Sequence, residues 1–290
     1  MRLALMIEGQ EGVTWDDWAA LARGCEEYGV EALFRSDHYL SGVEPGRPAL
    51  DAWAVIPALA ALTERIELGT LVSPVTFRQP AVLANASSTA NEIAGGRVTL
   101  GMGTGWMEAE HERFGFPFPE LKTRLRWLEE QIEAVQRFWG DGPRPRLILG
   151  GSGLSGTVEP AARWADEYNT IFVSPEECAR RREKLARACE RHGREPIPLS
   201  LMTACAIGRD EAEARDRIRR RLERAGQAID PEEWRAARGE AAVVGTLEEA
   251  AAQLRRFEQA GVERVMLQHL DHQDLDMVEL IGRELAPLVA

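Results

Sequence analysis

Residues 147–174 read LILGGSGLSGTVEPAARWADEYNTIFVS, and this stretch decides between two folds. An apolar run that predicts a strand leads into GSGLSG, a literal G-x-G-x-x-G, and then into a predicted helix. In a dinucleotide-binding fold this motif belongs to the first βαβ unit, and an acidic residue ends the next strand. Here the loop follows the fifth predicted strand, and Ser174 lies where the acid belongs. The motif therefore predicts a loop that binds a single phosphate group at a helix N-terminus.

Strand-like and helix-like segments alternate along the whole chain. Thr14 with Asp17, and Thr246 with Glu249, have the spacing of helix capping boxes. Eight strand–helix units in a chain of this length predict a (β/α)8 TIM barrel with a parallel sheet. We expect one barrel domain over residues 1–290, with a polar helical excursion around 209–246. The eight predicted strands are 2–7, 31–36, 66–72, 97–103, 146–150, 168–173, 199–207 and 264–268.

The composition excludes several classes of function. The chain carries 35 Lys and Arg against 47 Asp and Glu, a formal net charge of −12, which argues against broad binding to nucleic acid or anionic membranes. The apolar start MRLALMI is too short for a signal peptide core, and no uncharged run approaches the roughly 18 residues of a membrane span. Four cysteines without C-x-x-C spacing indicate free thiols in a reducing compartment. We therefore expect a soluble cytoplasmic protein.

Polar residues follow the second predicted strand, where a barrel of this type places its chemistry. Asp37 and His38 lie at that strand end, so a catalytic role is one reading and a hydrogen-bonded loop anchor is the other. The long segment that follows, rich in Gly and Pro, is a candidate lid. After the third strand, PVTF suits either the flat face of an aromatic ring or simple packing.

The fourth and eighth strands also end in candidate site residues. Gly101, Gly103 and Gly105 indicate close approach of the backbone to a bulky group, and Trp106 offers a stacking surface. Nearby polar residues are Glu108, Glu110 and His111, but their spacing is not the H-E-x-x-H of a zinc site, so we expect no metal. Gln268 and His269 could face the mouth, and the arginine-rich run 217–224 indicates a solvated helix face rather than an anion patch.

Five stretches together resemble the bacterial luciferase-like monooxygenase superfamily, and within it the branch that uses the deazaflavin coenzyme F420. They are SDHY (36–39), RIELGTLVSPVTFRQPAVLA (65–84), GGRVTLGMGTGWMEAEHERFG (95–115), ADEYN (165–169) and VVGTLEEAAAQLRRFEQAGVERVMLQ (243–268). They occur in the family's order over nearly the whole chain.

The resemblance implies a barrel mouth that holds a flavin-like cofactor. Asp37 and His38 match positions beside the deazaflavin, where the histidine assists proton transfer. Leu71–Val72 matches a non-prolyl cis peptide that bulges against the ring. The implied cofactor-binding residues are Asp37, Leu71, Val72, Gly103 and Trp106 around the ring, and Gly151, Ser152, Gly153 and Thr157 at its phosphate.

One departure concerns the substrate. Related sugar-phosphate dehydrogenases have a catalytic glutamate after GTG, where this chain has Trp106. Their substrate is therefore not carried over, and either Trp106 or Glu108 takes the place of that glutamate. Trp53, Trp106 and Phe114 favour an apolar or aromatic substrate, although each also suits a core position.

The expected function is hydride transfer between coenzyme F420 and a small organic substrate, with His38 exchanging the proton. An FMN-dependent monooxygenase is the first alternative. A barrel that binds a flavin or a phosphorylated ligand without turnover is the second, and a metal-dependent hydrolase is the last. By analogy with the family, we expect a homodimer.

Overall fold

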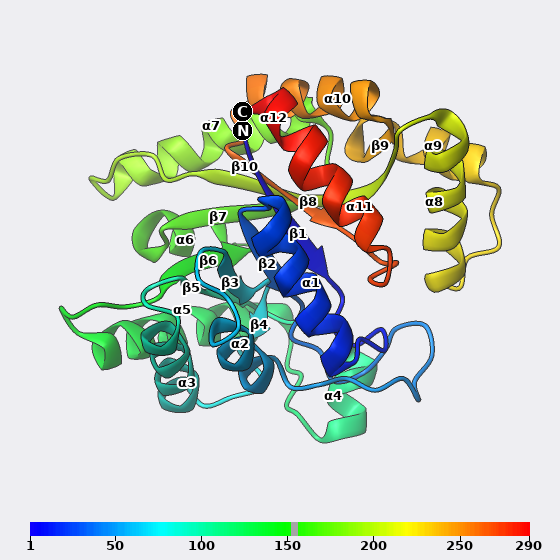
Figure 1. Ribbon diagram of the computed structural model, residues 1–290. Helices are drawn as coiled ribbons and strands as arrows, with labels where there is room; N and C mark the ends of the chain where they lie inside the picture. The colour runs from blue at the N-terminus through cyan, green and yellow to red at the C-terminus, as the bar shows by residue number, and fades with distance from the viewer. Residues whose placement is uncertain (152–155) are drawn as a thin grey trace.

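Eight parallel strands form a closed ring at the centre of the structure, a computed structural model that describes residues 1–151 and 156–290 (Figure 1). The hydrogen-bonded order is β10-β1-β2-β3-β5-β6-β7-β8, and pairing of β8 with β10 closes the ring. The predicted TIM barrel is thus confirmed. The strands are β1 (Arg2–Ile7), β2 (Ala32–Arg35), β3 (Glu67–Thr70), β5 (Val98–Gly103), β6 (Arg146–Gly150), β7 (Glu167–Ile171), β8 (Leu199–Gly208) and β10 (Arg264–Gln268).

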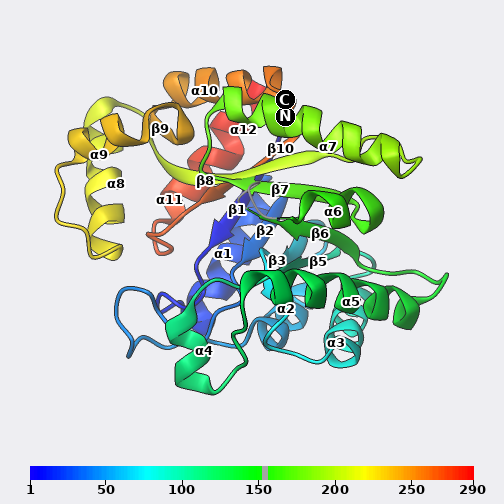
Figure 2. The same cartoon turned by 180° about the vertical axis from the view of Figure 1, so that it is seen from behind.

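Helices surround the ring on its outer side (Figures 1 and 2). The capping boxes predicted at Thr14 and Thr246 both form, with Asp17 and Glu249 as the reciprocal partners. The helices are α1 (Trp15–Tyr28), α2 (Ala52–Ala60), α3 (Pro80–Ile93), α4 (Glu108–Phe114), α5 (Leu121–Trp139), α6 (Val158–Trp164), α7 (Pro175–Arg191), α10 (Leu247–Gln259), α11 (Leu275–Glu279), a π-helical segment (Leu280–Leu285) and α12 (Ala286–Val289).

Strand residues alternate between two apolar layers. On β1, Leu3, Leu5 and Ile7 pack against the helices, whereas Ala4 and Met6 point into the barrel. The barrel interior is a small cluster of side chains from several strands, which we call the lumen cluster; it consists of Ala4, Met6, Ala32, Phe34, Leu71, Ile148, Met202 and Met266. The lumen is therefore a packed core, as in other barrels of this kind.

A buried ion cluster lies at the N-terminal ends of the strands, which we call the barrel floor. Arg264 begins β10 and is fully buried; its Nη1 lies 2.8 Å from Glu67 Oε2 at the start of β3. Its Nη2 also pairs with Glu167 at the start of β7. Because a buried charge is costly without a partner, these carboxylates make the burial of Arg264 tolerable.

The excursion at 209–246 extends the sheet at the other end of the barrel. It contains α8 (Glu211–Arg224), α9 (Pro231–Arg238), a 3₁₀ turn (Gly239–Ala241) and β9 (Val243–Thr246). The short strand β9 was not predicted. It pairs in parallel with Cys205–Gly208, the part of β8 that runs beyond the ring. In Figures 1 and 2 this unit projects from one side of the barrel.

Two further features concern the cysteines and the apolar character of the helices. All four cysteines are free and buried. Within residues 1–151 and 156–290, no helix combines the length and the apolar character needed to cross a bilayer.

Candidate active site at the barrel mouth

His38 and Glu110 form the central polar pair of the mouth. His38 follows β2, and Glu110 lies on α4, the short helix after β5. His38 Nδ1 lies 2.7 Å from Glu110 Oε2, and Glu110 is fully buried. The other oxygen of Glu110 accepts hydrogen bonds from the backbone N–H groups of Tyr39 and Leu40. The carboxylate therefore holds both the imidazole and the loop that carries it.

The surroundings of His38 favour its protonated form. Burial alone would lower the pKa of His38, but the hydrogen bond and charge of Glu110, with further charge from Glu8 and Asp37, raise it above its ordinary value. The side chain is 10% exposed, and its ring meets the edge of Trp106 at a centroid distance of 5.6 Å. Trp106 itself is 69% exposed. His38 is thus held rigidly yet reachable from the mouth, the properties of a general acid or base.

Asp37 lies beside His38 in the chain but contacts different groups. Arg78 Nη1 and Nη2 donate to Asp37 Oδ2 and Oδ1 at 2.5 and 3.1 Å, and the Ser73 hydroxyl donates at 2.6 Å. Arg78 also donates to Tyr39 Oη and to Asp51 Oδ2. Because both oxygens of Asp37 bind protein groups and its side chain is 1% exposed, the carboxylate anchors the loop.

The peptide bond between Leu71 and Val72 is cis, as the resemblance implies. Val72 packs into a recess that three strand-end glycines leave open. A Cβ at Gly103 would lie 2.5 Å from Val72 Cγ2, and a Cβ at Gly150 would lie 2.9 Å from Val72 Cγ1. A Cβ at Gly101 would lie 3.1 Å from Cγ1 and only 2.1 Å from the carbonyl oxygen of Thr70. These glycines are therefore required by the packing of Val72 at the mouth.

Among the remaining candidates, His111 after β5 and Trp53 on α2 have structural roles. His111 is buried, with Nδ1 2.7 Å from the Met107 carbonyl oxygen and Nε2 2.7 Å from the Thr76 hydroxyl. Glu108 is exposed on α4. Trp53 is buried in the main core, where its Nε1 donates to Ser73 Oγ. Trp53 is thus a core residue, one of the two alternatives that its sequence position allowed.

Of the predicted phosphate loop, Gly151 and Thr157 lie within the described residues, and Ser152 and Gly153 lie outside them. Gly151 N–H donates to the Asn169 carbonyl oxygen at 3.2 Å. Thr157 is buried just before α6, and its hydroxyl lies 3.1 Å from Tyr168 Oη. The Asn169 side chain leaves its Oδ1 buried without a partner among the described residues.

A second polar chain crosses the mouth between β1 and β10. Gln268 Nε2 donates to Glu8 Oε1 at 2.6 Å, and Arg221 Nη2 on α8 donates to Gln268 Oε1 at 2.5 Å. His269 is turned away: its Nε2 lies 3.2 Å from the Asp274 carbonyl oxygen. Burial lowers the pKa of His269 to about 4, so this histidine is neutral at physiological pH.

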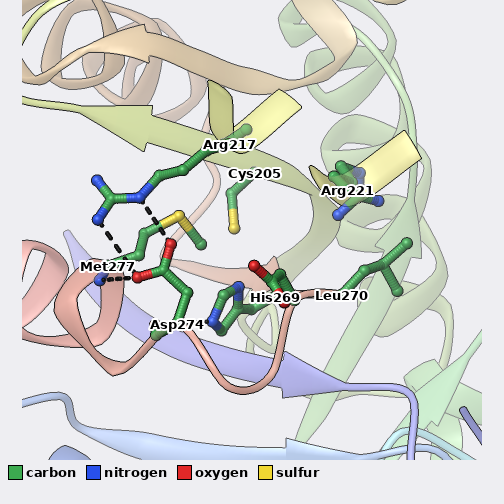
Figure 3. A pocket seen from close by; sticks show the side chains of 9 residues that line it. Cys205, Arg217, Arg221, His269, Leu270, Asp274 and Met277 are labelled. Atoms are coloured by element: carbon green, nitrogen blue, oxygen red, sulfur yellow. Dashed lines mark hydrogen bonds and ion pairs between the residues drawn. The ribbon is translucent and has the colours of Figure 1, made fainter. Parts of the chain in front are cut away.

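The arginine-rich run 217–224 was interpreted as a solvated helix face, and for two of its arginines this is wrong. Arg217 and Arg221 are 4% and 7% exposed. Figure 3 shows Arg217 directed at Asp274, with its Nε 2.8 Å from Asp274 Oδ2, around a small cavity of about 10 Å³. That space holds about one water molecule. Helical spacing turned these two side chains inward, while Arg219 remains paired on the surface.

The roles of three residues of the site, Arg78, Glu8 and Glu110, could not be recognised from the sequence. Arg78 and Glu8 lie far from His38 in the chain, and only the fold brings them to the same strand ends. Glu110 was one of three polar candidates after β5, and its position on the inner face of α4 distinguishes it from Glu108. No group of three or more His, Cys, Asp or Glu within residues 1–151 and 156–290 is placed to hold a metal ion.

The fold and this site define a (β/α)8 barrel with a carboxylate-held histidine at its mouth. The model of the luciferase-like monooxygenase family matches residues 2–264, and the chain belongs to this family. Among curated relatives, an F420-dependent glucose-6-phosphate dehydrogenase of Amycolatopsis mediterranei is 38% identical over 124 residues, which are 42% of this chain and 37% of the relative. The chain therefore matches little more than a third of the length of such relatives.

Two solved structures have closely similar folds. The monooxygenase RslO1 from Streptomyces bottropensis superimposes with a TM-score of 0.84 at 20% identity over 100% of both chains. An F420-dependent secondary alcohol dehydrogenase, in complex with an F420-acetone adduct, gives a TM-score of 0.81 at 18% identity over 100% of this chain and 99% of the other. At these identities the likeness concerns the fold alone.

Proposed function

We propose that this protein is an oxidoreductase that transfers a hydride between coenzyme F420 and a small organic substrate. The observation that carries the proposal is the His38–Glu110 pair, 2.7 Å apart, at the mouth of a barrel of the luciferase-like family. The names of the curated relatives, which are F420-dependent dehydrogenases, support the choice of cofactor. F420 supplies the hydride chemistry when bound, and the protein supplies orientation and proton transfer.

The described residues fit a flat ring at the mouth. Gly101, Gly103 and Gly150 leave a recess without side chains, and Val72 fills it to form one wall. Trp106, exposed beside His38, supplies an aromatic surface. We infer that Leu71, Val72, Gly103 and Trp106 contact the ring, and that the loop with Gly151, Ser152, Gly153 and Thr157 binds the phosphate.

His38 is the proposed proton carrier. Its Nδ1 is held by Glu110, and its Nε2 makes no hydrogen bond within the described residues, so Nε2 is free to exchange a proton. In the oxidising direction His38 accepts the proton of a substrate hydroxyl as the adjacent carbon loses its hydride, and reduction reverses both steps. Asp37 acts through position: its pairing with Arg78 fixes the backbone that presents His38.

The first alternative is an FMN-dependent monooxygenase, because a Baeyer-Villiger monooxygenase of Pseudomonas putida, solved in complex with FMN, shares the fold. The second is a barrel that binds its ligand without turnover. Anaerobic titration with F420 and with FMN, followed by assay of bound F420 with secondary alcohols and with electron acceptors, separates the three. We expect saturable binding of F420 and a change in its absorbance on turnover. Binding of FMN alone favours the first alternative, and binding without any reduction favours the second.

We further propose that the protein acts in the cytoplasm as a homodimer on a substrate with an apolar or aromatic body. The free cysteines support a reducing compartment, and exposed Val82 and Ile93 on α3 offer an apolar surface for a second copy. Exposed Trp106 and Phe114 support an apolar contact with the substrate. Light scattering on the purified protein tests the dimer, because a monomer at micromolar concentration would contradict it.

A further inference from the structure

A cavity of about 170 Å³ lies on the β7–β10 side of the mouth, between the barrel and the 209–246 excursion. About 10–15 Å³ of such space holds one water molecule, so the cavity has room for part of a small organic molecule. It takes residues from the strand exits of the barrel and from both helices of the excursion. Its main lining residues are Phe172, Arg221, Trp234, Arg238, Gln268 and Leu270.

Arg238 lines this cavity, and its side chain makes no hydrogen bond or ion pair within residues 1–151 and 156–290. Its guanidinium carbon lies 5.7 Å from the Phe172 ring centroid and 5.5 Å from the Trp234 ring centroid. Arg235, one turn earlier on the same helix, pairs instead with Glu211 and Glu249. The aromatic rings thus hold the Arg238 guanidinium in place and leave its N–H donors free for another acceptor.

Arg221 adds a second positive charge with neutral partners. It is buried, and it donates to the carbonyl oxygen and the side-chain oxygen of Gln268 at 2.7 and 2.5 Å. Burial lowers the pKa of Arg221 to about 10, and the positive charge of Arg238 acts in the same direction, against the opposing effects of Cys205 and Glu8. Two guanidinium groups that repel each other at one cavity create a favourable place for an anion.

Phe172 is an independent sign that this cavity is functional. It follows β7 directly and has a φ of 49°, in the left-handed region that bulky residues rarely adopt. Such residues cluster at ligand sites, where the surrounding structure maintains the strain. Phe172 also packs against both the lumen cluster and the cluster of the excursion, so it joins the cavity to the barrel mouth.

We propose that this cavity binds the anionic head group, a carboxylate or a phosphate, of the organic substrate, with Arg238 and Arg221 as its ligands. The proposal deepens the function proposed above and rests on it for the identity of the ligand as substrate. Planar guanidinium groups match the two oxygens of a carboxylate or phosphate, and an anion between them removes their mutual repulsion.

The polar chain across the mouth links this anion site to the proton carrier. Gln268 accepts from Arg221 and donates to Glu8 Oε1, and the charge of Glu8 contributes to the raised pKa of His38. Glu8 therefore lies near both the anion site and His38. A substrate anchored by its anionic end in the cavity would extend its apolar body toward His38 and the Val72 wall.

The test uses the full chain and three probes that share a phenyl ring: benzoate, phenyl phosphate and benzamide, the neutral and near-isosteric counterpart of benzoate. Ligand-observed NMR titrations measure their binding to the wild-type protein, to Arg238→Gln and to the control Arg235→Gln. We expect saturable binding of benzoate or phenyl phosphate, weakened about tenfold or more by Arg238→Gln and unchanged in the control. The tighter of the two anions identifies the head group. Thermal unfolding of both variants verifies that they are folded.

Two outcomes would overturn the proposal: benzamide binding as tightly as benzoate, or Arg238→Gln binding both anions like the wild type. Failure of the F420 function is a separate result. If F420 does not bind but benzoate binding depends on Arg238, the anion site stands and the redox assignment is lost. If F420 binds and turns over while neither anion binds, the anion site is lost and the redox assignment stands.

Discussion

Arg264 and Arg221 are both buried arginines, one at the floor of the barrel and one at its mouth, and their surroundings are opposite. Arg264 is paired with Glu67 and Glu167, and although burial opposes it, these carboxylates raise its pKa. Among the described residues, Arg221 donates hydrogen bonds only to neutral oxygens of Gln268, and burial lowers its pKa. Arg264 is thus neutralised by carboxylates at the floor, whereas Arg221 has no carboxylate partner among the described residues and, under the proposal above, is available to an anionic ligand.

The difference agrees with the separate roles of the two ends of a (β/α)8 barrel. The N-terminal ends of the strands stabilise the fold, and the C-terminal ends and their loops carry the chemistry. Variants of the floor should therefore change the free energy of unfolding with little effect on activity of the folded protein. Variants of the mouth should change activity more than they change the free energy of unfolding.

Arg264→Met should have the largest effect on stability. It removes the cation nearest to Glu67 and to the fully buried Glu167, although Arg2 and Arg146 remain 3.8 and 3.7 Å from Glu167; loss of one partner of a buried ion pair costs about 3–5 kcal/mol. Urea unfolding measures this loss, and F420 affinity of the remaining folded protein should stay near the wild-type value. The matched control is Arg187→Met, because Arg187 pairs with Glu183 on the surface, where about 0.5 kcal/mol is at stake. Equal losses in the two variants would contradict the structural role of the floor.

His38→Ala should have the largest effect on activity. Without this proposed proton carrier, turnover should fall by roughly 10²- to 10⁴-fold while F420 still binds. Stopped-flow measurement of the F420 absorbance change and an equilibrium titration separate the two effects. His192→Ala, at a surface pair with Glu159 on the outside of the barrel, should leave both unchanged. Unaltered turnover in His38→Ala would remove His38 from the chemistry.

Most of the barrel was predictable because its signals are local. Alternating strand and helix patterns, and capping boxes at Thr14 and Thr246, each depend on a few neighbouring residues. Resemblance added the cis peptide at Leu71–Val72, which no local pattern indicates. Strand β9 was missed because VVGT is short and pairs only with the end of β8.

The parts of the site that were not predictable depend on whether a helical side chain faces the protein interior or the solvent, and on contacts between distant segments. The run 217–224 contains both paired surface arginines and buried ones, and the packing of α8 on β8 decides which are which. Likewise, Glu108 and Glu110 are two residues apart on α4, but only Glu110 faces His38. Arg78 becomes a partner of Asp37 only when β2 and β3 lie side by side.

Glu110→Gln should shift the pH profile of the mouth. Glu110 raises the pKa of His38, so the variant should lose the protonated histidine at a lower pH than the wild type. The rate of substrate reduction, which needs a proton donor, should then decline at lower pH. In the wild type, the His38–Glu110 pair stabilises the folded state below the ordinary histidine pKa of about 6.5, and this contribution is lost as pH rises through the raised pKa. Glu110→Gln should therefore lower the free energy of unfolding mainly at low pH.

The control for this shift is Glu108→Gln, on the same helix but exposed. It should leave the pH profile unchanged. If Glu108→Gln moves the profile and Glu110→Gln does not, then Glu108 is the functional partner of His38, and it takes the place of the glutamate that Trp106 replaces.

Arg221→Met should cost much less stability than Arg264→Met, and it tests the comparison of the two arginines directly. The same substitution as at Arg264 removes a buried charge here without leaving a carboxylate unpaired, so the loss should be about 1–2 kcal/mol, from the two acceptors of Gln268. Benzoate should stabilise the wild type against urea by mass action and stabilise this variant less. A loss as large as that of Arg264→Met would mean that Arg221 belongs to the structural core, and it would leave Arg238 as the ligand on which the anion site depends.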